Sequence, residues 1–128
     1  MILIVDDDPD IRAFITSVLS ALDYELAEAK SMEEGLKLYQ ELQPQLVITD
    51  IVMPGKNGFQ VIGEIRRISK EVPIIAITGN LHGKAGDYLR MSKSLGANHV
   101  MGKPLTIEKL TEAVTHFYPR QGERKAGG

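Results

Sequence analysis

The sequence predicts an α/β fold in which helices cover both faces of a parallel sheet. Short apolar segments alternate five times with segments of helical spacing along the 128 residues, and this alternation is typical of strand–helix units joined by right-handed crossovers. The apolar segments are almost continuously hydrophobic, as expected of strands that are buried on both faces. With 43% hydrophobic residues, a chain of this length can bury a substantial core within one domain.

The order of the elements follows from these segments and from the residues at the helix ends. Asp8 followed by Pro9, and Ser31 followed three residues later by Glu34, are typical helix starts. Gly96 is expected in the left-handed conformation that ends a helix. The expected strands cover residues 2–5, 24–29, 46–49, 73–78 and 98–101. The expected helices cover residues 9–22, 31–42, 57–69, 87–95 and 106–117.

The composition excludes several classes of function. There is no cysteine, which excludes a disulfide scaffold, a thiolate metal site and a cysteine nucleophile. The net charge of −2, from 15 basic and 17 acidic residues, does not favour direct binding of nucleic acid. No signal peptide or membrane-spanning stretch is recognisable, so a cytoplasmic location without membrane contact is expected. We expect residues 1–118 to form the domain and residues 119–128 to form a disordered tail, part of it an expression remnant.

Polar residues stand at the carboxyl ends of the predicted strands. Asp6 and Asp7 follow the first strand, Asp50 follows the third, Thr78 ends the fourth and Lys103 follows the fifth. Open α/β sheets bind their ligands in the crevice outside these strand ends. In a sheet of order 2-1-3-4-5 the first and third strands are neighbours, so the three carboxylates would converge. Such a cluster suits a hard divalent cation, above all Mg²⁺, and Lys103 adds one further positive charge.

Together these residues resemble the receiver domain of bacterial two-component response regulators, of which the single-domain chemotaxis regulator is a familiar member. The resemblance covers residues 1–117. It rests on the acidic run DDD, the turn after Asp50 with Pro54 and Gly58, Thr78 after an apolar strand, and the pair Lys103–Pro104. It implies a flavodoxin-like, doubly wound (βα)5 fold with a five-stranded parallel sheet of order 2-1-3-4-5. It also implies a phosphoacceptor switch rather than an enzyme, since such a domain catalyses only its own phosphorylation and dephosphorylation.

The resemblance further implies a magnesium site. Asp7 and Asp50 would coordinate Mg²⁺ directly, with the main-chain carbonyl of Val52 as a third protein ligand. Asp6 would act mainly through water bound to the metal. Asp8 is expected to cap the following helix instead of binding the metal.

The resemblance also assigns roles in phosphoryl transfer. Asp50 would attack the phosphorus of a phosphohistidine, Lys103 would pair first with Asp50 and then with a phosphoryl oxygen, and Thr78 would donate its hydroxyl to the phosphoryl group. The Lys103–Pro104 peptide bond is expected to be cis. These roles agree with the chemistry, because phosphoryl transfer needs in-line positioning and cancellation of charge on the equatorial oxygens.

The partners implied are a histidine kinase or histidine phosphotransfer protein, an unidentified downstream protein, and a second copy of the chain after phosphorylation. Ile11, Pro104 and Leu105 are expected to dock the helices of the kinase as an exposed apolar patch, with packing in the core as the alternative. One position departs from the family. Val100 stands where the family usually carries an aromatic residue that swings inward on activation, so the usual coupling of Thr78 to that aromatic residue is not implied.

Three alternatives stay open. The chain can be a receiver excised from a larger regulator or hybrid kinase. It can be a pseudo-receiver that binds partners without phosphorylation, although its acidic, hydroxyl and lysine residues are all in place. It can also be a phosphatase with an aspartyl nucleophile, of the haloacid dehalogenase type. The acidic run has the spacing of that enzyme's motif, but the turn after Asp50 would then have no role.

Overall fold

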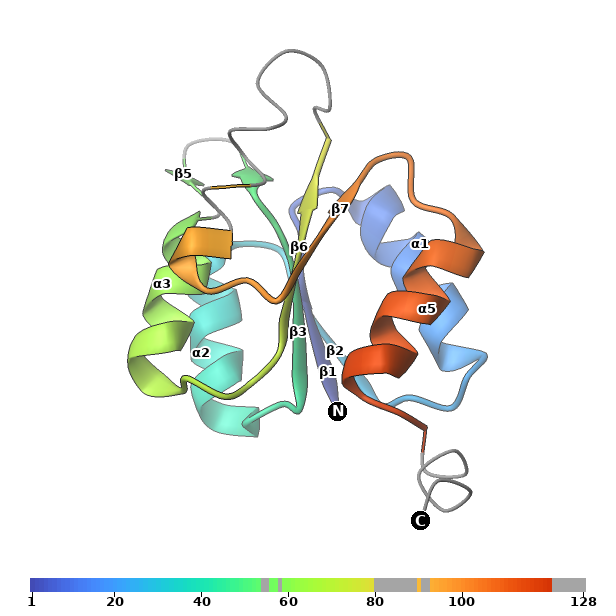
Figure 1. The fold of residues 1–128 in the computed structure, drawn as a ribbon, viewed down its shortest axis with the longest axis horizontal. Helices are drawn as coiled ribbons and strands as arrows, with labels where there is room; N and C mark the ends of the chain where they lie inside the picture. Colours follow the sequence, from blue (N-terminus) through green and yellow to red (C-terminus); the bar gives the residue numbers. More distant parts are fainter. Residues whose placement is uncertain (54–55, 58, 80–89, 91–92, 121–128) are drawn as a thin grey trace.

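A five-stranded parallel sheet forms the centre of the computed structural model, which describes all residues except 54–55, 58, 80–89, 91–92 and 121–128 (Figure 1). The strands of the sheet are β1 (Ile2–Val5), β2 (Leu26–Ala29), β3 (Leu46–Asp50), β6 (Ile74–Thr78) and β7 (His99–Gly102). They lie in the order β2-β1-β3-β6-β7, and every neighbouring pair is parallel. Counted along the chain, this is the order 2-1-3-4-5, so the predicted fold class is confirmed.

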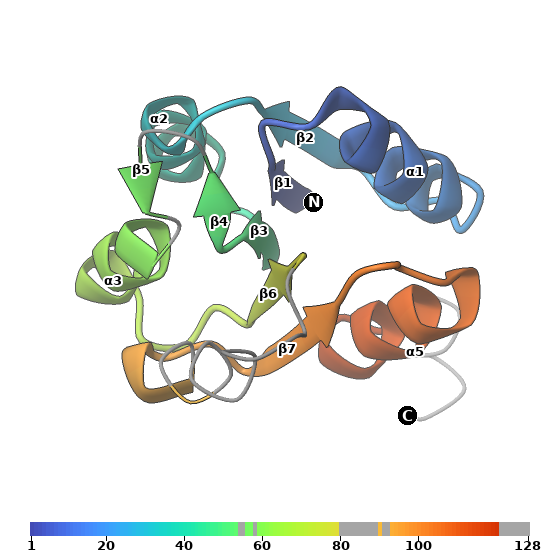
Figure 2. The same cartoon turned by 90° about the horizontal axis from the view of Figure 1, so that it is seen from above.

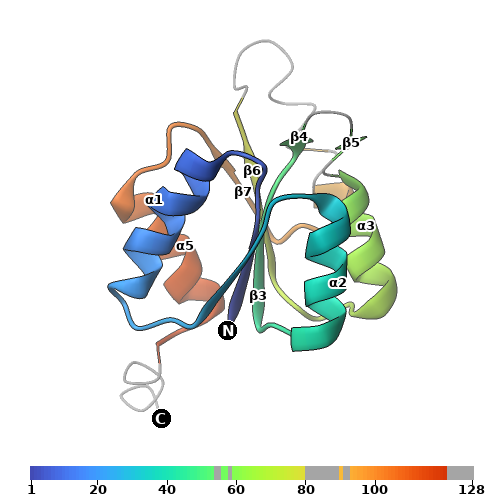
Figure 3. The ribbon, with the colours of Figure 1, turned by 180° about the vertical axis from the view of Figure 1, so that it is seen from behind.

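Helices cover both faces of the sheet. The described helices are α1 (Pro9–Ser20), α2 (Met32–Leu42), α3 (Phe59–Ile68) and α5 (Ile107–Phe117). Figures 1 and 2 show α2 and α3 on one face and α1 and α5 on the other, and Figure 3 shows the same two layers from behind. Among the described residues, no helix is long and apolar enough to span a membrane.

Each face of the sheet has its own hydrophobic core because successive side chains of a strand point to opposite sides. In β1, Leu3 and Val5 belong to the core under α2 and α3, whereas Ile2 and Ile4 belong to the core under α1 and α5. All four side chains are fully buried. The near-continuous apolar character of the strands therefore reflects burial on both faces.

The helix starts are those that the capping residues predict. The Asp8 side chain accepts a hydrogen bond from the amide of Asp10 at 2.9 Å, before Pro9 at the first helical position. The Ser31 hydroxyl accepts one from the amide of Glu34 at 3.2 Å. Each satisfies a backbone donor that the helix itself leaves without a partner. Asp8 is thus a helix cap, as expected.

Several predicted boundaries are wrong, among them the end of the first helix, which lies at Ser20 rather than at residue 22. The third helix does not begin at residue 57: that residue belongs to the strand β5 (Lys56–Asn57), which pairs antiparallel with β4 (Val52–Met53), and α3 starts at Phe59. The expected second strand begins at Leu26 rather than at Tyr24. Tyr24 instead packs its ring on Tyr118, with 5.5 Å between the ring centroids, and donates a hydrogen bond to the Tyr118 carbonyl. At the third helix a short-range strand pairing replaces the expected first residue, and at Tyr24 a contact with the distant residue Tyr118 overrides the local pattern.

Several predictions fall on residues outside the described part of the chain. These are the turn residues Pro54 and Gly58, residues 80–89 of the expected loop and helix start, and most of the tail. Of the fourth expected helix, residues 90 and 93–95 are described as helical. Gly96 follows with a φ of 115°, which confirms it as the left-handed residue at the helix end.

Arg66 joins α3 to the beginnings of β6 and β7. Its guanidinium donates to the carbonyl of Gly96 from Nε and Nη2, at 3.0 and 2.8 Å, and to the Asn98 side chain at 2.9 Å. Nη1 donates to the carbonyls of Ser69 and Val72 at 3.2 and 2.7 Å. Burial lowers the pKa of Arg66. These bonds fix the position of the residues just before β7. Because Lys103 directly follows the last residue of β7, they also help to set the position of Lys103.

Candidate functional site

Strand register brings Asp6 and Asp50 side by side at the carboxyl edge of the sheet. Val5 of β1 is paired with Thr49 of β3, so the next residue of each strand is an aspartate. Ligand oxygens of Asp6, Asp7 and Asp50 all lie within 4.8 Å of one another. Asp6 and Asp50 are only 1% and 3% exposed, whereas Asp7 is exposed. The convergence of the three carboxylates expected from the sequence is therefore present.

The Asp6 carboxylate is only half satisfied by the protein. Its Oδ1 accepts a hydrogen bond from the amide of Asp8 at 2.9 Å, while its buried Oδ2 has no hydrogen-bond partner among the described residues. Burial, with the charge of Asp50 as a smaller cause, raises the pKa of Asp6 to about 6. Buried polar atoms are normally paired. A carboxylate oxygen held in this way, beside two other carboxylates, fits a hard divalent cation with oxygen ligands such as Mg²⁺.

Lys103 provides the positive charge on the other side of Asp50. Its Nζ lies 3.2 Å from Asp50 Oδ2, and its amide donates to the carbonyl of Thr78 at 2.9 Å, which continues the pairing of β6 with β7. The Lys103–Pro104 peptide bond is cis, as expected. A Cβ added at Gly79 would lie 3.4 Å from Lys103 Cδ, so the backbone of Gly79 lies beside the lysine side chain. Lys103 is thus an ion-pair partner of a buried acid rather than a solvated surface lysine.

Thr78 and Val52 lie next to Asp50 along the backbone ladder. Asp50 is paired with Ile77 of β6, and fully buried Thr78 is the next residue of that strand. The amide of Ile51 donates to the carbonyl of Ile77 at 2.8 Å, and Val52 follows as the first residue of β4. The structure therefore gathers the expected site residues from β3, β6 and the β1 and β7 ends at one edge of the sheet.

The three residues expected to dock a kinase differ in exposure. Pro104 is exposed, whereas Ile11 and Leu105 are half-buried and pack against the core between the sheet, α1 and α5. Their side chains are thus partly core and partly surface. Val100, at the position where the family carries an aromatic, is half-buried on β7 and packs against the opposite core, under α2 and α3.

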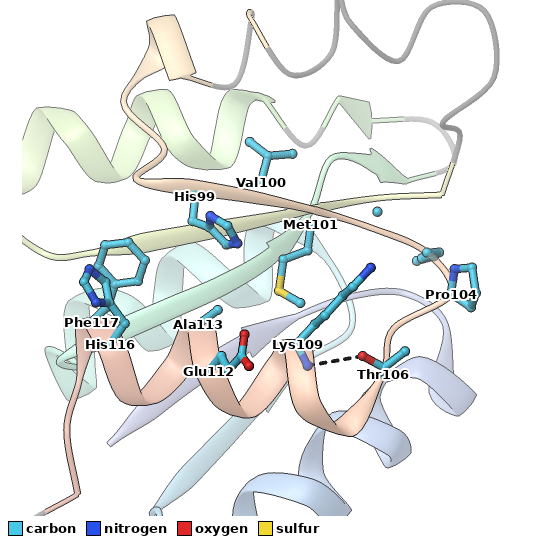
Figure 4. Close-up of a pocket in the computed structure, with 12 residues that line it drawn as sticks. His99, Val100, Met101, Pro104, Thr106, Lys109, Glu112, Ala113, His116 and Phe117 are labelled. Carbon is cyan, nitrogen blue, oxygen red and sulfur yellow. Dashed lines mark hydrogen bonds between the residues drawn. The ribbon is translucent and has the colours of Figure 1, made fainter. Parts of the chain in front are cut away.

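A groove of about 730 Å³ lies between β7 and α5 (Figure 4). His99 and Phe117 line it, with 6.2 Å between their ring centroids. Burial lowers the pKa of His99, and the nearby charges of Lys93 and His116 lower it further. Lys103 lines the groove as well. Sequence reasoning did not find this groove, because it is formed by a strand and a helix that contact only in the folded chain.

Arg12 is a second feature of the site that sequence reasoning missed. Its Nη1 donates to the main-chain carbonyl of Asp6 at 2.6 Å, and its Nε lies 3.4 Å from Glu28 Oε1. A single arginine in the first helix has no distinctive sequence signal, because its partners lie on two other elements of the fold.

Comparison with known proteins gives one consistent family. The family model of the response regulator receiver domain matches residues 2–115. Sporulation initiation phosphotransferase F of Bacillus subtilis is 30% identical over 118 residues, which are 92% of this chain and 93% of that protein. The probable C4-dicarboxylate response regulator DctR of the same species is 32% identical over 120 residues, which are 91% of this chain but 51% of that protein.

Solved structures agree with this result. The receiver domain of NtrX from Brucella abortus superposes with a TM-score of 0.84 at 28% identity, covering 91% of this chain and 97% of that one. The chemotaxis response regulator CheY4 of Vibrio cholerae superposes with a TM-score of 0.82 at 27% identity, covering 91% and 96%. The chain spans about half the length of several curated relatives, DctR among them. It belongs to the response regulator receiver domains, the signalling switches of two-component systems.

Proposed function

We propose that this receiver domain is a phosphoacceptor switch in a two-component phosphorelay, in which Asp50 accepts a phosphoryl group from a phosphohistidine. The donor would be a histidine kinase or a histidine phosphotransfer protein, in the cytoplasm. The observation that carries the proposal is the position of Asp50: a buried carboxylate within 4.8 Å of those of Asp6 and Asp7 and 3.2 Å from the Lys103 amine. In this proposal residues 1–118 form the switch.

The proposed metal ligands are the carboxylates of Asp7 and Asp50 and the main-chain carbonyl of Val52, with Asp6 acting through metal-bound water. When bound, Mg²⁺ would supply positive charge against the oxygens of the transferred group. The buried Asp6 Oδ2, which has no hydrogen-bond partner within the described part of the chain, supports this assignment.

The proposed reaction is a displacement at phosphorus. A carboxylate oxygen of Asp50 forms the new bond to phosphorus while the bond from phosphorus to the histidine nitrogen of the donor breaks, and the electron pair of that bond stays with the imidazole. Lys103 shifts its hydrogen bond from the Asp50 carboxylate to a phosphoryl oxygen, and the Thr78 hydroxyl donates to another. The product carries about −1.5 to −2 of charge, and this change would alter partner binding.

Intact mass tests the acceptor site. We expect incubation with Mg²⁺ and acetyl phosphate to add one phosphoryl group to the wild-type protein, and no adduct with Asp50→Ala or in the presence of EDTA. Asp10→Ala, which removes an exposed acid of α1, is the matched control and should keep the adduct. An adduct on Asp50→Ala would refute the assignment. A folded wild type that accepts phosphate from neither acetyl phosphate nor a phosphohistidine protein would be a pseudo-receiver.

A second copy of the chain is a further proposed partner after phosphorylation. The molecular mass of the protein in solution, measured with and without phosphodonor, tests this phosphorylation-dependent dimer.

Ile11, Pro104 and Leu105 are the proposed contact with the donor protein. We expect Ile11→Ser to slow phosphotransfer from a phosphohistidine protein about tenfold, as for a central interface residue, and to leave phosphorylation by acetyl phosphate unchanged. Ile68→Ser is the control, because Ile68 is 51% exposed at the end of α3, away from this contact. Equal transfer rates in both variants would remove these residues from the proposed interface.

A further inference from the structure

The main chain of Asp6 is held on both sides. Its amide donates to the carbonyl of Ala29 in β2 at 3.1 Å, and its carbonyl accepts from Arg12 Nη1 at 2.6 Å. Its side chain has one further restraint, the bond from the amide of Asp8 to Oδ1. Of these three bonds, the one from Arg12 is donated by the side chain of another residue, so a substitution can remove it while Asp6 itself stays unchanged.

Arg12 is itself fixed by Glu28. The Arg12 side chain is 13% exposed, and its Nε lies 3.4 Å from Glu28 Oε1. Glu28 lies on β2, the edge strand beside β1. The pair therefore ties α1 to the edge of the sheet across the point where β1 ends and the acidic run begins. It is also neutral as a unit, so it holds Asp6 without placing a net charge beside the carboxylates.

We propose that the Arg12–Glu28 pair positions Asp6 for metal binding. By holding the Asp6 carbonyl, Arg12 keeps the carboxylate in the cluster, close enough to those of Asp7 and Asp50 for a shared cation. Its Oδ2 then has no hydrogen-bond partner among the residues that the structure describes. This inference rests on the proposed function, because it assumes that the carboxylates bind Mg²⁺. Arg12 is a positioning residue here and does not touch the metal or the phosphoryl group.

If Arg12 acted only through its positive charge, its removal would have the opposite effect on the affinity for Mg²⁺. A cation near three carboxylates repels Mg²⁺, so loss of the arginine charge would tighten metal binding, and this effect would shrink at high salt. Loss of positioning weakens binding at every salt concentration, because residues that orient metal ligands commonly contribute about tenfold or more to affinity. The sign of the change therefore separates the two explanations.

Calorimetric titration with Mg²⁺ tests the inference in the full chain. The double variant Arg12→Met/Glu28→Gln keeps the net charge of the wild type and removes the hydrogen bond to Asp6. We expect its affinity for Mg²⁺ to fall about tenfold at both 0.15 M and 1 M salt. Arg67→Met/Glu64→Gln is the matched control. It deletes an Arg–Glu pair of 3.5 Å on the surface of α3 and should leave the affinity unchanged.

The outcomes separate the positioning role of the Arg12–Glu28 pair from the existence of the magnesium site. If the wild type binds Mg²⁺ and the double variant binds it equally well, this inference is wrong while the metal site stands. If the wild type binds no Mg²⁺, both fail. Should the double variant not fold, Arg12→Met alone is decisive, because tighter binding refutes positioning and weaker binding supports it. As a readout without metal, the amide resonance of Asp8 should shift in the double variant and stay in place in the control, because that amide reports the Asp6 carboxylate.

Discussion

At the scale of single residues, the site contains buried carboxylates whose charged forms are costly to keep away from water. Asp6 and Asp50 are buried carboxylates at one strand edge, and Lys103 is the cation paired with Asp50. The raised pKa of Asp6, caused first by burial, means that its charged form is less stable in the folded protein than in the unfolded chain. Function rather than stability therefore explains why an acid stands at this position.

Asp6→Asn should stabilise the protein without metal and weaken its binding of Mg²⁺. We expect the free energy of unfolding in EDTA at pH 7 to rise by about 1 to 3 kcal/mol, because the amide keeps the bond from Asp8 and removes the buried charge. Chemical denaturation and magnesium titration measure the two effects. The exposed acid Asp10 offers the control Asp10→Asn, which should not stabilise the protein. A destabilised Asp6→Asn protein would show that the carboxylate contributes to folding.

At the scale of elements, close packing of helices on the sheet carries the site. α2 rests on β1 through Gly35, where an added Cβ would lie 2.9 Å from Val5 Cγ2 and 3.1 Å from Val5 Cγ1. Val5 is the last residue of β1 before Asp6. The glycine therefore sets how closely α2 approaches the strand that delivers the first two carboxylates.

Gly35→Ala should destabilise the protein, whereas Gly63→Ala should stabilise it. An alanine at position 35 gains helix propensity but collides with buried Val5, and we expect a net loss of about 1 to 2 kcal/mol. A Cβ at Gly63, inside α3, meets no described atom within 4 Å apart from the nearby backbone of its own helix, so that variant should gain up to about 1 kcal/mol. Urea denaturation of the two variants checks both signs. Equal effects would mean that α2 can shift on the sheet at little cost.

At the scale of the whole molecule, one sheet joins two cores. β1, β3 and β6 contribute alternate side chains to the core under α2 and α3 and to the core under α1 and α5. Because both cores use side chains of the same strands, unfolding of one core would disrupt those strands and expose the other core to solvent. A ligand bound at the edge of this sheet is therefore coupled to the stability of the entire domain.

Magnesium should raise the stability of the domain in a single cooperative transition. Binding to the folded state alone adds RT ln(1 + [Mg²⁺]/Kd), about 2.7 kcal/mol at a hundredfold excess over Kd. Scanning calorimetry of the wild type with and without Mg²⁺ should show one peak that moves to higher temperature, and Asp50→Ala should show a smaller shift. Two separate peaks, or a peak that Mg²⁺ leaves in place, would contradict this coupling.

Much of the fold was predictable because local rules and tertiary packing agree. The apolar strands, the caps at Asp8 and Ser31 and the glycine at position 96 are read from neighbours in sequence, and the structure confirms each of them. The order of the sheet was implied by the resemblance to a family. The helix start at position 57 was wrong, because Lys56 and Asn57 pair antiparallel with Met53 and Val52 of β4 instead of extending α3.

The residue types of the site and their places at strand ends could be read from the chain, since a strand ends where its apolar run stops. The distances between these side chains could not be read from the sequence. Register between β1 and β3 decides that Asp6 meets Asp50, the end of β7 decides that Lys103 reaches Asp50, and the contact of α1 with the edge strand decides that Arg12 holds Asp6. Each of these depends on elements far apart in sequence, and only folding brings them into contact.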